Sequence, residues 1–352
     1  MEITPPRATE LVDVPSAMAR PTLSDVARLA GVSGKTVSRV ISGQHNVSVE
    51  TRERVMAAAT RLRFRPNHLA RDLRRGGVTT TVGFVMGDLT NPFYSSVAAG
   101  IEREMARHGL TMVIASTDDD PGHEAQVVAA MLERRVRSLL IVPIAPDQSY
   151  LEGERQLGTP VVCIDRPAHN LAADSVLFAN REGAAMAVRS LVERGHRKIG
   201  FIGSSPTLYT HLERLSGYRD ALIDAGLRVS REWERSDAHD TESASRATHE
   251  LLAGEDPPTA ILAANNRAST GVLRALRDTV RRIAFIGFDD FDLADTLGIT
   301  VVAHDPANMG TEAARLALTR ERDLSGAPTQ VVLPTHLVHR GSGELPPDQS
   351  AV

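Results

Sequence analysis

Two patterns of apolar and polar residues divide the 352-residue chain near residue 79. Before this point, apolar residues recur every three or four positions over short stretches, which is typical of small amphipathic helices. After it, apolar runs of strand length alternate with longer amphipathic segments of helical period. The sequence therefore predicts a small all-α module followed by a larger α/β region.

Three short helices are predicted within residues 21–65, each preceded by a residue that can cap it. Thr22 can form a capping box with Asp25 before the first helix, and Ser33 and Ser48 can cap the second and third. A glycine ends each of the first two helices. The predicted inward-facing residues are Val26, Leu29 and Ala30, then Val37, Val40 and Ile41, then Val55, Ala58, Ala59 and Leu62.

Beyond residue 79, the alternation of strands and helices predicts βαβ units that build parallel sheets. Two such sheets of similar size fit into the remaining chain, and a cleft between two lobes is the natural ligand site. The predicted strands are Val82–Met86, Thr111–Ala115, Leu139–Val142, Val161–Asp165, Lys198–Gly203, Ala260–Ala263, Arg282–Gly287 and Ile299–Ala303. The predicted helices are Phe93–His108, Glu124–Arg134, Glu182–Arg194, Glu213–Ala225 and Asn266–Asp278.

These patterns give five consecutive parts. The first twenty residues are rich in proline and lack an apolar period, so we expect them to be disordered. The segment after residue 65 has proline at its start and paired glycines at its end, as expected of a linker with some helical character. The predicted parts are an extension at 1–20, a helical headpiece at 21–65, a linker at 66–77, a two-lobed core at 78–343 and a flexible tail at 344–352.

Charge is distributed unevenly between these parts. Residues 21–77 contain 11 lysines and arginines against 4 acidic residues, although the net charge of the whole chain is −4. A basic module on an acidic body is typical of a nucleic-acid reader joined to another domain, although a solvated basic face has the same composition. Neither a signal peptide nor a run of 18 apolar residues is present, so we expect a cytoplasmic protein without a membrane span.

The first two predicted helices have the spacing of a helix-turn-helix. They are joined by a short turn that contains Gly31, and the second exposes Lys35, Ser38 and Arg39 near its start. Recognition helices contact base edges with their N-terminal residues. Arg39 can donate two parallel hydrogen bonds to guanine, and Lys35 can contact guanine or phosphate. This arrangement favours DNA binding over a plain helical pair with solvated bases.

Motifs of enzymes and metal sites are missing from the sequence, so we expect no enzyme activity, no cofactor and no bound metal. Gly34-Lys35-Thr36 matches only the end of a phosphate-binding loop, because Leu29 stands where that loop requires glycine. The acidic run 118–120 is interpreted as a solvated turn that caps the next helix. The single cysteine, Cys163, lies in an apolar run and is interpreted as a buried strand residue.

With these features in place, the chain resembles the lactose-repressor (LacI/GalR) family over nearly all of residues 21–343. The resemblance implies an all-α helix-turn-helix headpiece, a hinge helix and an α/β two-lobed core with parallel sheets, like that of periplasmic binding proteins. The residues that carry it are Thr22-Leu23-Ser24-Asp25-Val26-Ala27, Gly31-Val32-Ser33, Thr36-Val37-Ser38-Arg39-Val40, Arg65-Pro66-Asn67, Asn91-Pro92-Phe93-Tyr94, Ile164-Asp165-Arg166-Pro167, Gly195-His196-Arg197-Lys198-Ile199, Arg214 before Gly217-Tyr218, and Gly287-Phe288-Asp289-Asp290.

For DNA, the resemblance implies a homodimer on a pseudo-palindromic double-stranded operator, because a two-fold protein reads a two-fold site. Leu73 falls where the family wedges a leucine into the minor groove, although a leucine there could also pack the linker onto the core. The expected DNA-binding residues are Thr22, Ser33, Lys35, Thr36, Ser38, Arg39, Asn46, Asn67, His68, Ala70, Arg71 and Leu73.

For the core, the resemblance implies a site for a small sugar-like effector that controls DNA binding allosterically. Carboxylates and amides suit hydroxyl groups, an arginine can fork onto two oxygens, and an aromatic ring can face a sugar ring. Taken singly, each residue could instead be a helix cap or a surface charge. The expected effector-binding residues are Asn91, Phe93, Asp165, Arg214, Asn265, Asp289 and His304.

The chain departs from the family pattern at three places. Asn266 stands where an aspartate is usual and Arg267 follows it, so both a neutral sugar and an acidic or phosphorylated derivative stay open as effectors. Gly34 lacks a side chain where some relatives read a base, and the connection 278–282 is shorter than usual. We expect that shortened connection to be a surface loop that leaves the pocket intact.

The function that this reading predicts is a sequence-specific DNA-binding transcriptional regulator, more plausibly a repressor than an activator. Two alternatives remain: a solute-binding protein without DNA readout, and a DNA-binding regulator controlled by a protein co-regulator. An enzyme acting on the bound sugar lacks a nucleophile–base pair or a phosphate loop to support it. The short Pro-rich tail has no leucine heptad, so we expect no tetramer built from it.

Overall fold

The computed structural model describes residues 21–43, 46–65 and 79–347. Within the whole chain two compact units are distinguished, Met1–Thr79 and Thr80–Val352. The predicted extension 1–20, the linker 66–77 and the end of the tail lie outside the described residues. The two units are described separately below.

The first unit contains the three predicted helices: α1 (Leu23–Ala30), α2 (Gly34–Ile41) and α3 (Val49–Arg61). Their caps are the predicted ones, because the side chains of Thr22, Ser33 and Ser48 each accept a hydrogen bond from a backbone N–H in the first turn. Gly31 adopts the left-handed conformation with φ of 66° and ends α1, as its lack of a β-carbon allows.

A small apolar core joins the three helices, and one predicted core residue does not belong to it. Val26, Val37 and Val55 are fully buried between the helices. Leu29, predicted to face inward, is 43% exposed instead. Successive helical residues are about 100° apart, so the narrow buried stripe through Val26 and Ala30 leaves Leu29 on its flank.

The second unit consists of two α/β lobes. The N-terminal lobe contains β1 (Thr81–Met86), α5 (Pro92–Arg107), β2 (Thr111–Ser116), α6 (Pro121–Glu133), β3 (Leu139–Ile141), η1 (Ser149–Leu151), α7 (Glu152–Gln156), β4 (Val161–Ile164), β5 (Asp174–Phe178), α12 (Pro306–Arg320) and β11 (Gln330–Leu333). The C-terminal lobe contains α8 (Asn180–Glu193), β6 (Ile199–Ile202), α9 (Tyr209–Asp224), η2 (Arg231–Trp233), β7 (Glu234–Arg235), α10 (Thr241–Ala253), β8 (Ala260–Ala263), α11 (Asn266–Arg277), β9 (Ala284–Phe288), β10 (Thr300–Ala303), β12 (His336–Val338) and η3 (Ser342–Glu344).

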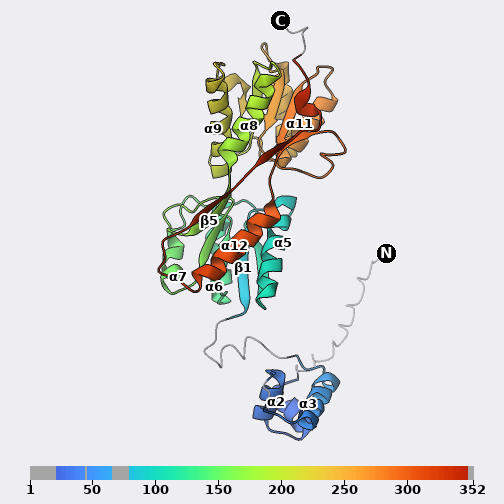
Figure 1. The fold of residues 1–352 in the computed structure, drawn as a ribbon, viewed down its shortest axis with the longest axis vertical. Helices are drawn as coiled ribbons and strands as arrows, with labels where there is room; N and C mark the ends of the chain where they lie inside the picture. Colours follow the sequence, from blue (N-terminus) through green and yellow to red (C-terminus); the bar gives the residue numbers. More distant parts are fainter. Residues whose placement is uncertain (1–20, 44–45, 66–78, 348–352) are drawn as a thin grey trace, which may run out of the picture. The chain divides into compact units, whose positions relative to one another are not determined.

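Each lobe is built on a six-stranded sheet, in the orders β11-β5-β4-β3-β1-β2 and β12-β10-β9-β8-β6-β7. The strands pair in parallel, as predicted, except that β12 runs antiparallel to β10. The chain passes between the lobes after β5, after β10 and between β11 and β12, so each lobe is assembled from separate stretches of sequence (Figure 1).

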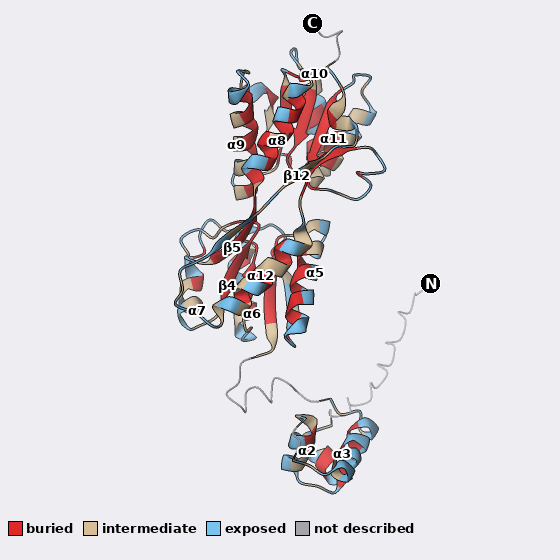
Figure 2. Cartoon of the chain, viewed as in Figure 1, coloured by how far each residue is buried: buried red, intermediate tan, exposed pale blue. Residues whose placement is uncertain are grey.

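Helices cover both faces of each sheet, so the strands are the most buried part of each lobe (Figure 2). In the N-terminal lobe, α5 and α12 pack on one face and α6 on the other. In the C-terminal lobe, α8 and α9 cover one face and α10 and α11 the other. Strands buried on both faces read as continuous apolar runs, which explains why the sequence reveals them.

Two details of the core bear on the sequence predictions. Cys163 is fully buried in β4, and burial raises the pKa of its thiol to about 12. Leu345, just after the last described 3-10 turn, accepts a hydrogen bond at its carbonyl oxygen from the buried His196 ring, so the packed chain continues past residue 343. No helix among the described residues has both the length and the apolar character that a bilayer crossing requires.

Candidate DNA-binding surface and effector cavity

The exposed face of α2 carries the predicted DNA-contacting residues of the headpiece. Lys35, Ser38 and Arg39 are exposed, whereas Val37 and Val40 on the same helix are buried against the other helices. Within the described part of the chain, neither Lys35 nor Arg39 forms an ion pair. The buried valines therefore fix the helix on its core and leave two cations, four residues apart, on its outer face.

Other predicted DNA residues have a structural task in this unit. The Thr22 hydroxyl donates to the Asp25 carboxylate at 2.7 Å, and the Ser33 and Thr36 hydroxyls lie 2.9 Å apart at the start of α2. Asn46 is exposed before α3. The Thr22 hydroxyl thus belongs to the cap of α1, and the Ser33 and Thr36 hydroxyls belong to the start of α2. The predicted contacts Asn67, His68, Ala70, Arg71 and Leu73 lie outside the described residues.

In the second unit, a cavity of about 680 Å³ lies between the lobes. It opens at the carboxyl ends of the parallel strands, where the following turns supply polar side chains from both lobes. Six of the seven predicted effector residues line it, namely Asn91, Phe93, Asp165, Arg214, Asn265 and Asp289. The seventh, His304, lines a neighbouring cavity of about 350 Å³.

Two buried aspartates follow strands β4 and β9 and reach the cavity from opposite lobes. Asp165 and Asp289 both adopt left-handed backbone conformations, with φ of 67° and 72°. Burial raises the pKa of Asp165, and the nearby Arg166 and Arg214 only partly oppose it. Burial also raises the pKa of Asp289, but Arg214 and a hydrogen bond from His304 outweigh it, so the net shift is downward. Asp289 is thus the more firmly ionised of the two.

Arg214 on α9 is held in place by contacts within the protein. Its Nε donates to Asn180 Oδ1 at 2.7 Å, its Nη1 donates to the Ala264 carbonyl oxygen at 2.5 Å, and its guanidinium lies over the Phe288 ring at 3.7 Å. Nη1 is also 3.5 Å from Asp289 Oδ1. The arginine therefore orients Asp289 as well as lining the cavity.

The two predicted asparagines are helix caps at the cavity wall. Asn91 Oδ1 accepts from the backbone N–H of Phe93 at 3.1 Å, and Asn265 Oδ1 accepts from that of Ala268 at 2.8 Å. Capping fixes each side chain and leaves its amide N–H₂ group for other partners. The cap and the cavity position are therefore compatible tasks for the same residue.

His304 contacts Asp289 and two aromatic rings beside the cavity. Its side chain is 1% exposed, its Nε2 donates to Asp289 Oδ1 at 2.8 Å, and its ring stacks on Phe178 with centroids 4.1 Å apart. Phe93 contacts the same ring edge-on at 5.7 Å. Because Phe93 and Phe178 belong to the N-terminal lobe, this aromatic cluster packs the two lobes together beside the cavity.

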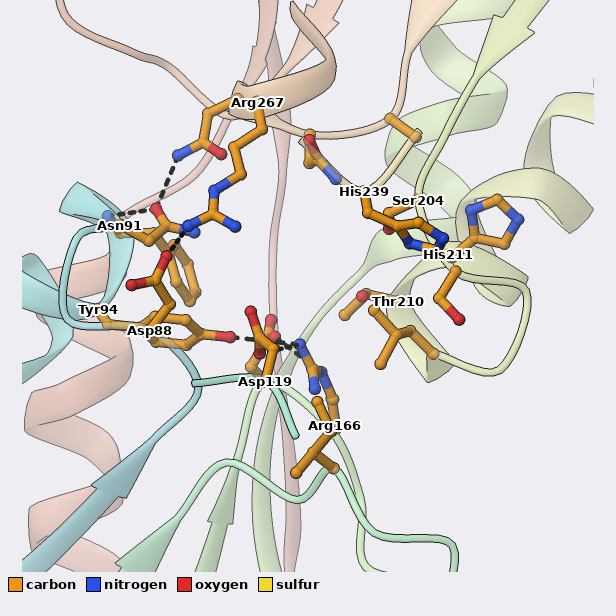
Figure 3. A pocket seen from close by; sticks show the side chains of 18 of the residues that line it. Asp88, Asn91, Tyr94, Asp119, Arg166, Ser204, Thr210, His211, His239 and Arg267 are labelled. Carbon is orange, nitrogen blue, oxygen red and sulfur yellow. Dashed lines mark hydrogen bonds and ion pairs between the residues drawn. The ribbon is translucent and has the colours of Figure 1, made fainter. Parts of the chain in front are cut away.

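Further cavity residues were missed by the sequence prediction. Arg166 directly follows Asp165 and donates to the Tyr94 hydroxyl at 3.3 Å, and its Nε is buried without a hydrogen-bond partner (Figure 3). His211 on α9 has two buried ring nitrogens that also lack partners, and burial together with Arg214 lowers its pKa to about 4. The remaining lining residues outside the predicted set are Asp88, Tyr94, Asp118, Asp119, Pro121, Ile144, Ser204, Ser205, Thr207, Leu208, Thr210, His239, Ala264, Asn266 and Arg267.

A signal for some of these residues is present in the sequence. Arg166 and Tyr94 stand beside predicted residues in the same motifs, and Asp118 and Asp119 directly follow a predicted strand. Asp120 caps α6 as predicted, while Asp118 and Asp119 line the cavity. Among the described residues, no group of three or more His, Cys, Asp or Glu side chains is arranged to hold a metal ion.

The fold and the cavity define a helix-turn-helix module joined to a two-lobed ligand-binding domain. The family of bacterial regulatory proteins named lacI matches residues 22–67, and the periplasmic binding protein-like domain matches residues 188–343. The ribose operon repressor of Haemophilus influenzae is 30% identical over 305 residues, which cover 85% of this chain and 91% of that protein. The repressor PurR of Photobacterium profundum is 29% identical over 309 residues, covering 86% and 92%.

Solved structures agree with these relatives. The complex of the transcriptional regulator CelR with cellobiose is 31% identical, has a TM-score of 0.69 and covers 92% of this chain and all of its own. The lac repressor dimer bound to operator and an anti-inducer is 25% identical with a TM-score of 0.82, covering 92% and 99%. The chain belongs to the LacI family and is a DNA-binding transcriptional regulator with a ligand-binding domain.

Proposed function

We propose that this regulator is a repressor that binds a pseudo-palindromic operator as a homodimer. Binding of a small sugar-like effector between the lobes raises or lowers its affinity for the operator. The observation that carries the proposal is the pairing of an exposed cationic recognition helix with a polar interlobe cavity in one chain. The lac repressor dimer bound to operator supports the DNA-binding part of the proposal.

On the DNA side, we assign base contacts to Lys35, Ser38 and Arg39. All three are exposed on α2, and Arg39 has the fork geometry that reads guanine in the major groove. Thr22, Ser33, Thr36 and Asn46 are assigned to phosphate contacts or to orientation of the helix. Because it acts on operator DNA, we place the protein in the cytoplasm.

On the effector side, we assign the hydroxyl-accepting role to Asp165 and Asp289 and the ring-facing role to Phe93. Buried carboxylates form strong hydrogen bonds with hydroxyl donors, and an aromatic face suits the apolar face of a sugar ring. The cellobiose complex of CelR supports a sugar as the ligand class. Closure of the lobes around such a ligand would couple to DNA binding by about 1–3 kcal/mol, the usual allosteric scale.

The test is selection of random duplex DNA by the full-length protein, followed by sequencing of the bound fraction. The proposal predicts an enriched pseudo-palindrome with two half-sites, as a dimeric reader requires. The matched variant Arg39→Ala should lose enrichment at a defined base pair in each half-site. Absence of enrichment at low salt, where phosphate contacts are strongest, would instead identify a solute-binding protein without DNA readout.

A further inference from the structure

A polar clasp, formed by Asp88, Thr90, Asn91, Asn266 and Arg267, connects the two lobes beside the main cavity. Asp88 follows β1 in the N-terminal lobe, and Arg267 lies in the first turn of α11 in the C-terminal lobe. The two side chains form an ion pair (Figure 3). Arg267 Nη2 also donates to Thr90 Oγ1 at 3.3 Å. Beside them, Asn266 Nδ2 donates to Asn91 Oδ1 at 2.8 Å.

The clasp also forms a wall within the interlobe space. Asn91, Asn266 and Arg267 line both the 680 Å³ cavity and the neighbouring 350 Å³ cavity, so the clasp lies between them. Asp88 is fixed on its own lobe by Thr90, whose backbone N–H and hydroxyl donate to its carboxylate at 2.7 and 2.8 Å. A carboxylate fixed in this way is already oriented to accept hydrogen bonds from a guanidinium of the opposite lobe.

Each arginine that lines the main cavity lies within 4 Å of a carboxylate. Arg166 lies 3.6 Å from Asp165, Arg214 lies 3.5 Å from Asp289, and Arg267 pairs with Asp88. Asp118 and Asp119 add two further carboxylates to the lining, and burial keeps His211 neutral near pH 7. An anionic ligand would therefore meet an excess of carboxylates and would compete with a neighbouring carboxylate for each guanidinium.

We propose that Asp88 determines effector specificity: by pairing with Arg267 it withholds that cation from the ligand, so the cavity selects uncharged, hydroxyl-bearing molecules over phosphorylated or carboxylate-bearing ones. The proposal rests on the proposed function of the cavity as the effector site. It decides between the two effector classes that Arg267 leaves open in the sequence. Asp88 accordingly acts as a specificity residue, and Arg267 acts as a lobe-bridging residue.

The test uses inorganic phosphate as the probe and full-length protein, with binding measured by isothermal titration calorimetry at constant ionic strength. The native chain should show no phosphate binding that depends on Arg267. Asp88→Asn frees Arg267, keeps an oxygen for the Thr90 N–H, and should bind phosphate at least about tenfold more tightly than the native chain. The double variant D88N/R267Q should return to the native level. Any phosphate bound by the basic headpiece is common to all these proteins and cancels in the comparison.

The matched control is Asp118→Asn, which removes the same charge from the same cavity. Asp118 accepts a hydrogen bond from the Ser116 hydroxyl, so its loss frees no arginine. Equal gains in D118N and D88N, or no gain in a folded D88N, would overturn the proposal. If circular dichroism shows that D88N does not fold, R267Q provides the test. R267Q should bind phosphate as the native chain does, and weaker binding by R267Q would contradict the proposal. The assay contains no DNA, so its outcome is independent of operator binding.

Discussion

Replacing Arg214 with methionine tests whether the cavity depends on a buried charge network. The Arg214 and Asp289 side chains are only 6% and 11% exposed. Removing the guanidinium leaves Asp289 buried without its cation and leaves Asn180 Oδ1 and the Ala264 carbonyl without their donor. Breaking a buried pair from one side costs about 3–5 kcal/mol, and methionine keeps much of the apolar contact with Phe288.

The matched control is Arg181→Met on α8 of the same lobe. Arg181 and Asp220 also form an ion pair, at 2.6 Å, but their side chains are 57% and 41% exposed. Exposed pairs contribute about 0–1 kcal/mol. The two variants remove the same chemical group and differ in burial, so their difference isolates the effect of the buried network.

Urea unfolding followed by tryptophan fluorescence measures both variants. Trp233 is the single tryptophan of the chain and is buried in the C-terminal lobe, so it reports on the lobe that contains Arg214. With a urea m value of about 1–3 kcal/mol/M, Arg214→Met should lower the unfolding midpoint by about 1 M or more. A shift no larger than that of Arg181→Met would refute the reasoning.

The stability difference between the native protein and Arg214→Met should also depend on pH, in a direction set by the pKa of Asp289. In the native protein the pKa of Asp289 is lowered, so its ionised form contributes stability above the unfolded pKa, which is lost as pH falls through the folded value. In Arg214→Met, the arginine no longer lowers the pKa of Asp289, so that pKa is higher than in the native protein. The stability difference between native and variant should therefore narrow as pH falls from 7 toward 4, and a widening would contradict the account.

Three further outcomes follow from single positions. Arg39→Ala should weaken binding to the selected operator by about 1–3 kcal/mol, and equal loss on random DNA would remove its base-reading role. The thiol of Cys163, with its pKa raised to about 12 by burial, should react with a thiol reagent on the order of a thousandfold more slowly in native than in urea-unfolded protein, and comparable rates would show that it is accessible. Gly310→Ala puts a β-carbon 2.0 Å from the Val97 carbonyl oxygen between α5 and α12, so thermal unfolding should show destabilisation by about 1–3 kcal/mol or more, whereas an unchanged midpoint would mean that the helices can separate at no cost.

The elements that the sequence predicted are those whose signal is local. Each of the eight predicted strands is present. Seven of them are buried along almost all of their length, as continuous apolar runs indicate, whereas the edge strand β2 is largely exposed. The edge strands β7, β11 and β12 are short and partly exposed, so their residues carry no such run. Helices α7, α10 and α12 and strand β5 were also missed. Alanines form much of the buried faces of α10 and α12 and give a weak apolar pattern, whereas β5 is fully buried and was missed despite its apolar run.

The candidate site shows the same division. Asp165, Arg214 and Asp289 could be assigned from short motifs at strand ends or on one helix, and they line the cavity as predicted. The pairing of Asp88 with Arg267 joins residues nearly 180 positions apart and depends on how two lobes face each other. His304 was predicted to bind the effector and lines the neighbouring cavity, and its contacts with Asp289 and Phe178 could not be predicted from the sequence. Such contacts need the assembled fold.

The central claim is that occupancy of the interlobe cavity controls operator affinity, and one titration tests it most directly. Neutral sugars that raise the thermal stability of the full-length protein are identified first, and operator affinity is then measured with and without them at fixed salt. The account predicts a change of about 5–150-fold that disappears in Asp289→Asn while the affinity of the unliganded protein is retained. A sugar whose binding requires Asp289 but leaves operator affinity unchanged would contradict it.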